Sequence, residues 1–235
     1  MNISITRIQA IFMKDYKEFS RNYAVSIMAL IPLILAFIYN KTGVASLQIL
    51  MLLVNMTFSL VTAYVQCCLI AEEKEKNTLR SLMLSPATLG DILIGKSSFV
   101  FILSSAVIAL TIYLYGFEPA NLLLLAIATL LSTIFYIAVG TFCGLFTKTI
   151  MEASIIILPV MLIFLGGSFA FGMSEAYSIL KIAEWLPSTQ FNILAETLEG
   201  NYSSTDVMIP FVTIFAWTLF TWLVTIIFYK KRMVD

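Results

Sequence analysis

Long apolar stretches dominate this chain and restrict what it can fold into. Of its 235 residues, 60% are hydrophobic and 12% are charged, and the mean hydropathy is +0.95. In a bilayer, such stretches satisfy their backbone polar groups as helices or as a closed barrel, and a span of about 20 apolar residues fits a helix. We therefore predict an all-α integral membrane protein in which residues 1–235 form one transmembrane domain. Its six spans are expected at about 23–39, 45–70, 98–115, 121–146, 153–171 and 207–229.

The spans leave only short connections, with no room for a soluble catalytic domain. The chain has no histidine, which removes the usual zinc ligand and the usual general base. Its cysteines, Cys67, Cys68 and Cys143, lie inside apolar runs and are expected to be small buried side chains. We therefore expect no catalytic site, no metal and no cofactor in this chain, so that any energy source must be a separate chain.

The first 22 residues combine apolar side chains at helical spacing with several basic ones. This pattern predicts an amphipathic helix lying in the membrane interface, and a solvated lead-in segment is the alternative. The interspersed charges also differ from the continuous apolar core of a secretory signal. The apolar positions are Ile5, Ile8, Phe12, Tyr16 and Phe19.

A charged stretch, residues 71–97, separates the second and third apolar runs. Because apolar runs stand on both sides, we expect this stretch to lie in water. Leu79, Leu82 and Met83 follow its charged start, and Pro86 ends the pattern, which predicts a short amphipathic helix. Such a helix suits either the membrane surface or a groove on a partner protein.

Within that stretch, Gly90–Ser97 matches the phosphate-binding pattern GxxxxGK[ST]. A phosphate-binding loop needs a buried strand before it, a soluble helix after it and an acidic residue on a second strand. Here a membrane span follows instead, so we interpret the match as chance. We expect Lys96 to anchor the start of the third span at the membrane interface.

The second span carries four polar residues spaced four, three and four apart. This spacing places them on one helical face, which should contact protein or water rather than lipid. Hydrogen bonding between helices and lining of a substrate path both remain open. The residues are Asn55, Ser59, Thr62 and Gln66.

Three further patterns bear on packing and orientation. Gly140 and Gly144 form a GxxxG pair that predicts close helix contact, and Pro32 predicts a kink in the first span. Residues 172–206 are mixed in polarity and contain two short amphipathic pieces, at about 174–185 and 188–198. If the amino terminus is cytoplasmic, 12 of the 14 basic residues lie on the cytoplasmic side, which favours both termini inside.

The charged stretch resembles the corresponding loop of the permease subunits of ABC-2 type (type V) ATP-driven exporters. The similarity lies in acidic residues, a Thr-Leu step, a Leu-x-x-Pro element and a Gly-Lys pair, and it extends to the six-span layout. Gly95 and Lys96 are that Gly-Lys pair. The resemblance implies that seven residues couple the chain to an ATPase: Glu72, Glu73, Glu75, Thr78, Leu79, Leu82 and Pro86.

The same resemblance implies partners and a location. It implies a cytoplasmic ATP-binding subunit that carries ATP and Mg²⁺, a second permease subunit, identical or not, and a bacterial plasma membrane; it implies no nucleic acid. It also implies that residues 172–206 form an extracellular helical hairpin dipping into the outer leaflet, with Leu186, Pro187 and Gly200 as landmarks. The expected cargo is amphipathic: an antimicrobial or cytolytic peptide, a lipid-like molecule or a drug.

Two other classes of function stay open. A secondary carrier or small channel would need no ATPase, although a proton-coupled carrier normally has a carboxylate deep in a span and none is expected here. A structural assembly factor would transport nothing.

Overall fold

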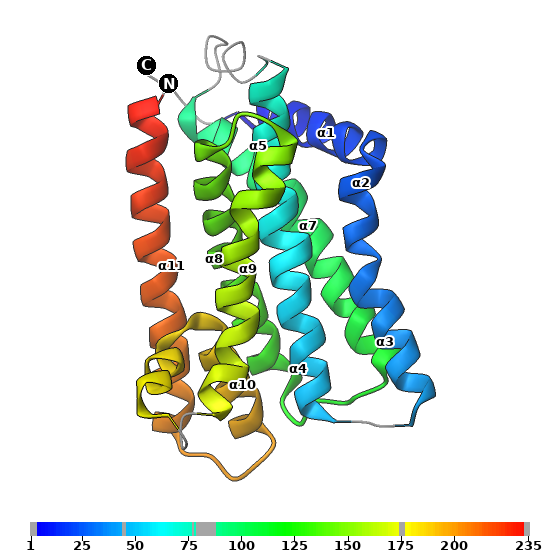
Figure 1. Ribbon diagram of the computed structural model, residues 1–235, viewed down its shortest axis with the longest axis vertical. Helices are drawn as coiled ribbons and strands as arrows, with labels where there is room; N and C mark the ends of the chain where they lie inside the picture. Colours follow the sequence, from blue (N-terminus) through cyan, green and yellow to red (C-terminus); the bar gives the residue numbers. More distant parts are fainter. Residues whose placement is uncertain (1–3, 44–45, 77, 79–87, 174–176, 233–235) are drawn as a thin grey trace.

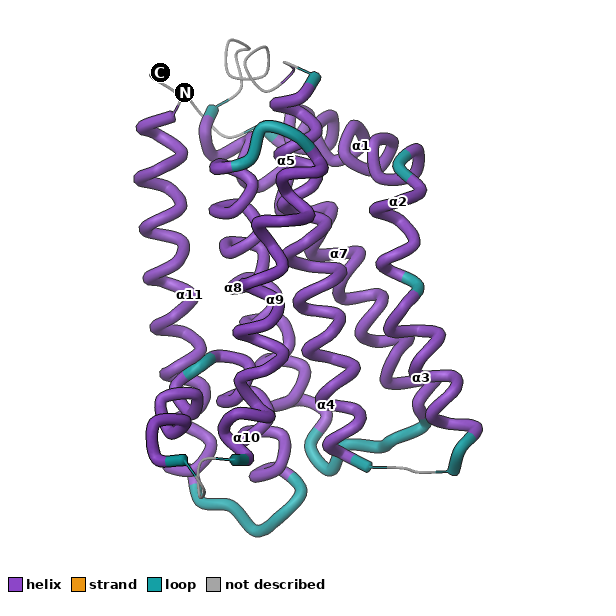
Figure 2. The backbone as a smooth tube through the Cα atoms, viewed as in Figure 1, coloured by secondary structure: helices purple, strands orange, loops and turns teal. Residues whose placement is uncertain are grey.

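The protein is a bundle of long helices. The structure, a computed structural model, describes residues 4–43, 46–76, 78, 88–173 and 177–232. The described residues form helices joined by short connections and contain no strand (Figure 2). Six helical stretches are long and apolar enough to cross a membrane: Tyr23–Lys41, Leu47–Glu75, Gly90–Tyr115, Leu122–Phe146, Ile150–Gly172 and Ser204–Lys231. The prediction of an all-α membrane protein with six spans is confirmed.

The helices follow the predicted order along the chain (Figure 1). They are α1 (Ile5–Arg21), α2 (Tyr23–Ser26), the 3₁₀ turn η1 (Ile27–Ala29), α3 (Ile31–Lys41), α4 (Leu47–Met56), the π-helical segment η2 (Thr57–Ala63), α5 (Tyr64–Glu75), α7 (Leu89–Tyr115), α8 (Leu122–Phe146), α9 (Ile150–Gly172), the 3₁₀ helix η3 (Ser178–Trp185), α10 (Pro187–Leu198) and α11 (Ser204–Arg232). In the first span, η1 interrupts the helix just before Pro32, which lies in the first turn of α3, in agreement with the predicted kink.

Side-chain caps fix where several spans begin. Thr88 and Asp91 form a capping box at the start of α7, and Asn121 and Thr149 cap α8 and α9. Each cap accepts a hydrogen bond from a backbone N–H that has no partner within its helix. At the other end of α7, Gly116 adopts a left-handed conformation with φ of 76°, which an L side chain rarely adopts.

α8 packs against α11, α5 and η2. Gly140 and Gly144 make this contact close. A Cβ added at Gly140 would overlap the backbone oxygen of Ala63, and one at Gly144 would lie 2.8 Å from Cβ of Ile70. The GxxxG pair therefore brings α8 against the second span, as the sequence predicts.

α1 lies across one end of the bundle, roughly perpendicular to the spans (Figure 1). Asp91 fixes its start: the carboxylate accepts a hydrogen bond of 2.8 Å from the backbone N–H of Ser4 and pairs with Arg7 at 3.3 Å. Gly95 allows α1 to cross α7 closely, since a Cβ there would lie 2.8 Å from Cβ of Ile11. The predicted amino-terminal helix is present and docked on the bundle.

Two observed boundaries place charged residues inside helices. The second span continues to Glu75, and α7 begins at Leu89, well before the predicted start of the third span at about residue 98. The stretch expected in water therefore includes two ends of packed helices. The amphipathic helix predicted between them, with its stop at Pro86, falls on residues 77 and 79–87, which lie outside the described residues.

Candidate functional site

The last turn of α5 is bonded to four other helices. Its central residue, Glu73, pairs with Lys14 of α1 and with Lys96 of α7. The side chains of Glu73 and Lys96 are 0% and 3% exposed. A buried charge is tolerated only when it is paired, so this carboxylate with its lysines joins α1, α5 and α7.

The two residues after Glu73 hold the turn between α8 and α9. The Lys74 ammonium donates to the carbonyl oxygens of Gly144 and Thr147, at 3.2 and 2.8 Å, and also to that of Leu145. Glu75 accepts a hydrogen bond of 3.0 Å from the backbone N–H of Ile150, the first residue of α9. A cation therefore meets the carbonyl end of α8 and an anion meets the N–H end of α9, which matches both helix dipoles.

In the last turn of α5, Glu72 pairs with Lys76, four residues later in the chain. The Lys76 ammonium is about half exposed, and its hydrogen bond to Glu72 raises the pKa of the lysine. Exposed pairs of this kind contribute about 0–1 kcal/mol. Thr78 closes the turn by donating from its hydroxyl to the carbonyl oxygen of Glu73 at 3.3 Å.

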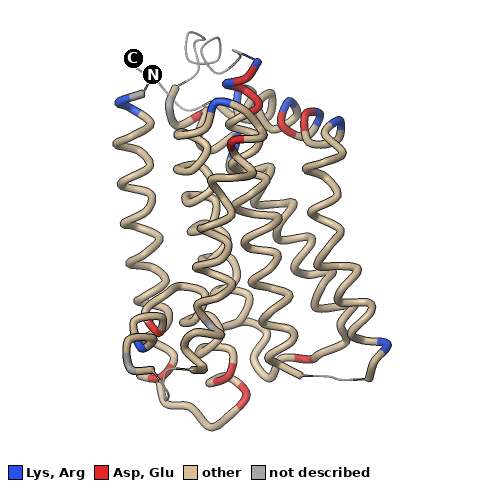
Figure 3. Tube along the Cα trace, in the orientation of Figure 1, with Lys and Arg blue, Asp and Glu red and all other residues tan. Residues whose placement is uncertain are grey.

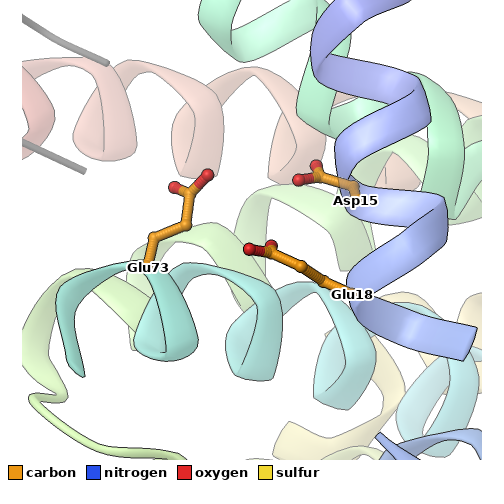
Figure 4. Close-up of side chains that lie close together, drawn as sticks. All are labelled: Asp15, Glu18 and Glu73. Carbon is orange, nitrogen blue, oxygen red and sulfur yellow. The ribbon is translucent and has the colours of Figure 1, made fainter. Parts of the chain in front are cut away.

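Two further carboxylates converge on that of Glu73. Asp15 and Glu18 of α1 point towards Glu73 (Figure 4), and one carboxylate oxygen of each of the three residues lies within 4.8 Å of the others. The Lys14 ammonium lies among them: it pairs with Glu73, with Glu18 at 3.5 Å and with Asp15 at 3.7 Å. A lysine thus supplies the positive charge that this carboxylate group needs.

Burial shifts the titration of the α1 members of this group. It raises the pKa of the Asp15 and Glu18 carboxyls and lowers the pKa of Lys14, which also feels the nearby charge of Lys96. In each case burial disfavours the charged form. The site is therefore an electrostatically strained junction between α1 and the spans.

The structure places the predicted coupling residues in two groups. Glu72 and Glu73 are buried, so the expectation that the charged stretch lies in water is wrong for these two. Glu75 is exposed. Glu73 and Glu75 bond to neighbouring helices, whereas Glu72 pairs with Lys76 four residues later. Lys96 is likewise buried against Glu73, so its interpretation as an interfacial anchor is wrong. Leu79, Leu82 and Pro86 lie outside the described residues.

The GxxxxGK[ST] match does not form a phosphate-binding loop. Gly90–Ser97 lies within the first turns of α7, where the backbone N–H groups beyond the first turn bond to helix carbonyls and cannot cradle a phosphate. Lys96, the residue that would reach a phosphate, is engaged by Glu73. The interpretation as chance agrees with this geometry.

Sequence reasoning misses the α1 members of the site. Asp15 stands at the helical spacing of the apolar residues Ile8, Phe12 and Phe19, and is 0% exposed. An acidic residue on the apolar face of an amphipathic helix indicates a buried cation nearby. That signal is present in the sequence, but it does not identify Glu73 and Lys96 as the neighbours.

Three of the four polar residues of the second span bond to three different helices. The fourth, Ser59, is buried, and its hydroxyl has no hydrogen-bond partner among the described residues. Asn55 donates to Asn192 of α10 at 2.7 Å, Thr62 to Ser104 of α7 at 2.9 Å, and Gln66 to Thr141 of α8 at 3.0 Å. The π-helical segment η2 lies within this row and rotates less per residue than an α-helix. The α-helical spacing used to place the four residues on one face does not account for that difference. Hydrogen bonding between helices therefore accounts for Thr62 and Gln66, while a role in lining a path stays a prediction.

Asn55 also lines a cleft at the end of the bundle opposite the termini. The cleft has a volume of about 370 Å³ and lies between α4, α9 and α10. Its walls mix apolar side chains, including Met51 and Phe169, with the polar Asn55 and Asn192. This size and lining are typical of small-molecule sites.

A family profile described as ABC-2 family transporter protein matches residues 1–229. The chain belongs to this family. No curated protein matches the chain. ABC-2 family membership implies an ABC ATPase as partner and a multi-pass membrane location, and it agrees with the six apolar helices. Membrane subunits of ABC-2 transporters are generally not catalytic themselves.

Proposed function

We propose that the chain is the membrane-spanning permease subunit of an ATP-driven exporter in a bacterial plasma membrane. ATP and Mg²⁺ bind a separate cytoplasmic ABC subunit, and a second permease copy, identical or not, completes the path. The cargo is an amphipathic molecule such as a cytolytic or antimicrobial peptide, a lipid-like molecule or a drug.

The observation that carries this proposal is the position of the α5 end. Its final turn is bonded to α1, α7, α8 and α9, and it begins the charged stretch, residues 71–97, which resembles the ATPase-coupling loop of ABC-2 exporters. A force applied to that loop would move α5, and its bonded neighbours with it, because buried ion pairs and packed helices resist separation. Coupling therefore requires no catalytic group in this chain.

The charge distribution supports a cytoplasmic location for this end. Figure 3 shows charged residues at the two ends of the bundle. Among the described lysines, Lys41 ends α3 and Lys181 lies in η3, both away from the α5 end, whereas Lys14 in α1 and Lys96 in α7 pair with Glu73 of α5 and Lys74 lies in the last turn of α5. By the positive-inside rule, this distribution supports a cytoplasmic location for both termini and an outer location for the cleft.

The alternative of an ion-coupled carrier receives less support. Its acidic side chain would lie midway along a span. The buried acids of the described residues are Asp15, Glu72, Glu73 and Asp91. Asp15 lies in α1, which crosses one end of the bundle; Glu72 and Glu73 lie in the last turn of α5, and Asp91 lies in the first turn of α7. None of these four lies midway along a span. ATP therefore remains the better-supported energy source.

Reconstitution tests the proposal. The chain is purified with the P-loop ATPase that accompanies it and placed in proteoliposomes with a labelled amphipathic peptide on the ATPase side. We expect peptide movement that requires ATP and stops when the P-loop lysine of the ATPase is replaced by alanine. Movement driven by a proton or sodium gradient without the ATPase would contradict the proposal and support the carrier.

A further inference from the structure

The cleft between α4, α9 and α10 contains buried polar atoms that lack partners among the described residues. Asn55 is 3% exposed; its side-chain nitrogen donates to Met51 and to Asn192, whereas its oxygen Oδ1 accepts no hydrogen bond from the part of the chain that the structure describes. Thr189 is 1% exposed, and its hydroxyl is also without a partner. Buried polar atoms without partners are costly, so these two call for a hydrogen-bonding occupant.

The charged group that lines the cleft is acidic. The exposed carboxylate of Glu196 lines it, and none of the described residues that line it is basic. The surrounding end of the bundle is acidic as well. In the described part of the chain, η3, α10, the start of α11 and the connections beside them hold Glu118, Glu184, Glu196, Glu199 and Asp206, against Lys41 and Lys181. An acidic rim attracts cations and repels anions.

The remaining walls are apolar. Met51, Phe169 and Ile193 are among the residues that line the cleft beside the polar group. At about 370 Å³, the cleft suits a head group with one apolar substituent rather than a whole folded peptide.

We propose that this cleft binds amphipathic organic cations, with an ammonium or guanidinium group donating to Asn55 Oδ1 and the Thr189 hydroxyl and facing Glu196, while an apolar tail contacts Met51 and Phe169. The inference rests on the proposed function only in treating the cleft as part of the export path. It narrows the cargo from amphipathic molecules in general to cationic ones.

Equilibrium binding to the full chain in nanodiscs tests this assignment. The probe is rhodamine 6G, an aromatic fluorescent cation with N–H donors, and its anisotropy is compared with that in protein-free nanodiscs. Dodecylammonium and dodecanoate, which share an apolar chain and differ in charge, serve as competitors. We expect saturable binding that dodecylammonium displaces and that dodecanoate at equal concentration does not.

Three variants locate the binding. Glu196→Gln removes the charge, and Thr189→Val replaces a hydroxyl without a partner by a methyl group of similar size, so the fold should persist. Each should weaken rhodamine 6G binding by about fivefold. Glu118→Gln removes an exposed carboxylate at the same end that does not line the cleft, and should leave binding unchanged.

Equal displacement by dodecanoate, unchanged affinity in both cleft variants, or no saturable binding would each overturn the assignment. Because the measurement uses the chain without an ATPase and without ATP, its result does not depend on transport. ATP-driven movement of an anionic cargo alone would leave the exporter proposal standing and remove this one.

Discussion

Glu73 of α5 and Lys96 of α7 form an ion pair between two side chains that are almost completely buried, and the same carboxylate also pairs with Lys14 of α1. Separated by long stretches of sequence, these residues hold the amino-terminal helix and two spans together. Because the two charges neutralise each other, these residues of the charged stretch can be buried between packed helices.

Removing the Glu73 charge should destabilise the protein strongly. Glu73→Gln leaves two lysines without their shared partner, and breaking a buried pair costs about 3–5 kcal/mol. Thermal unfolding of the detergent-solubilised chain measures this loss. Glu72→Gln, which removes an adjacent charge from a partly exposed pair, should cost about 0–1 kcal/mol. Equal stability of the two variants would contradict the account of Glu73.

The turn between α8 and α9 should depend on Lys74. Lys74→Met removes a charged donor from backbone carbonyls at the end of α8, and a hydrogen bond to a charged group contributes about 1.5–3 kcal/mol. In the reconstituted complex, we expect less cargo moved per ATP hydrolysed. Lys148→Met removes an exposed lysine from the same turn and should leave this ratio unchanged; a similar loss in both variants would show that Lys74 has no special role.

Gly140 should tolerate no side chain. Gly140→Ala places a methyl group against the backbone oxygen of Ala63, and overpacking of this kind costs about 1–3 kcal/mol. Gly166→Ala in α9 is the matched control, because a Cβ added there would have no neighbour within 4 Å. Thermal stability should fall in the first variant and stay level or rise in the second, since alanine favours helix. A stable Gly140→Ala protein would contradict the observed contact.

Stability should depend on pH through Asp15. Burial raises the pKa of its carboxyl above the usual value, against the attraction of Lys14 and Lys96 and with the repulsion of Glu72. Because the folded-state pKa lies above the unfolded one, ionising this carboxyl lowers the stability of the folded state. The loss is absent below the unfolded pKa of about 4, and it is complete above the folded pKa.

Asp15→Asn removes that penalty. We expect the variant to unfold at a higher temperature than the parent at neutral pH, with a difference that shrinks as the pH falls towards about 4. Thermal unfolding between these limits is the measurement. A variant less stable than the parent at neutral pH would show that pairing with lysine outweighs burial at this position.

The sequence predicts the spans well because apolar length decides them, and it predicts the pieces at 174–185 and 188–198 because Pro187 separates them; η3 and α10 occupy these positions. The sequence-based prediction is wrong about where α7 begins, because the charged residues before residue 98 indicate a segment in water. Lys96 stays inside the helix because Glu73 neutralises it, and that partner is visible only in three dimensions.

The candidate site is predictable in part. The loop resemblance identifies Glu72, Glu73 and Glu75, but the contacts of Glu73 to α1 and α7 and of Glu75 to α9 join residues far apart in the chain. The spacing of polar residues identifies the polar row of the second span as well. Its distribution over α7, α8 and α10 follows from the π-helical segment, which has no simple sequence signature.

The central claim is that the loop following α5 contacts an ATPase in the cytoplasm, and site-specific photo-cross-linking tests it most directly. A photoreactive amino acid replaces Leu82 in this loop or Trp185 at the opposite end of the bundle, and the membranes are irradiated. We expect the Leu82 variant to cross-link to a P-loop ATP-binding protein and the Trp185 variant not to. Cross-linking from Trp185 instead, or no P-loop protein captured from Leu82, would contradict the account.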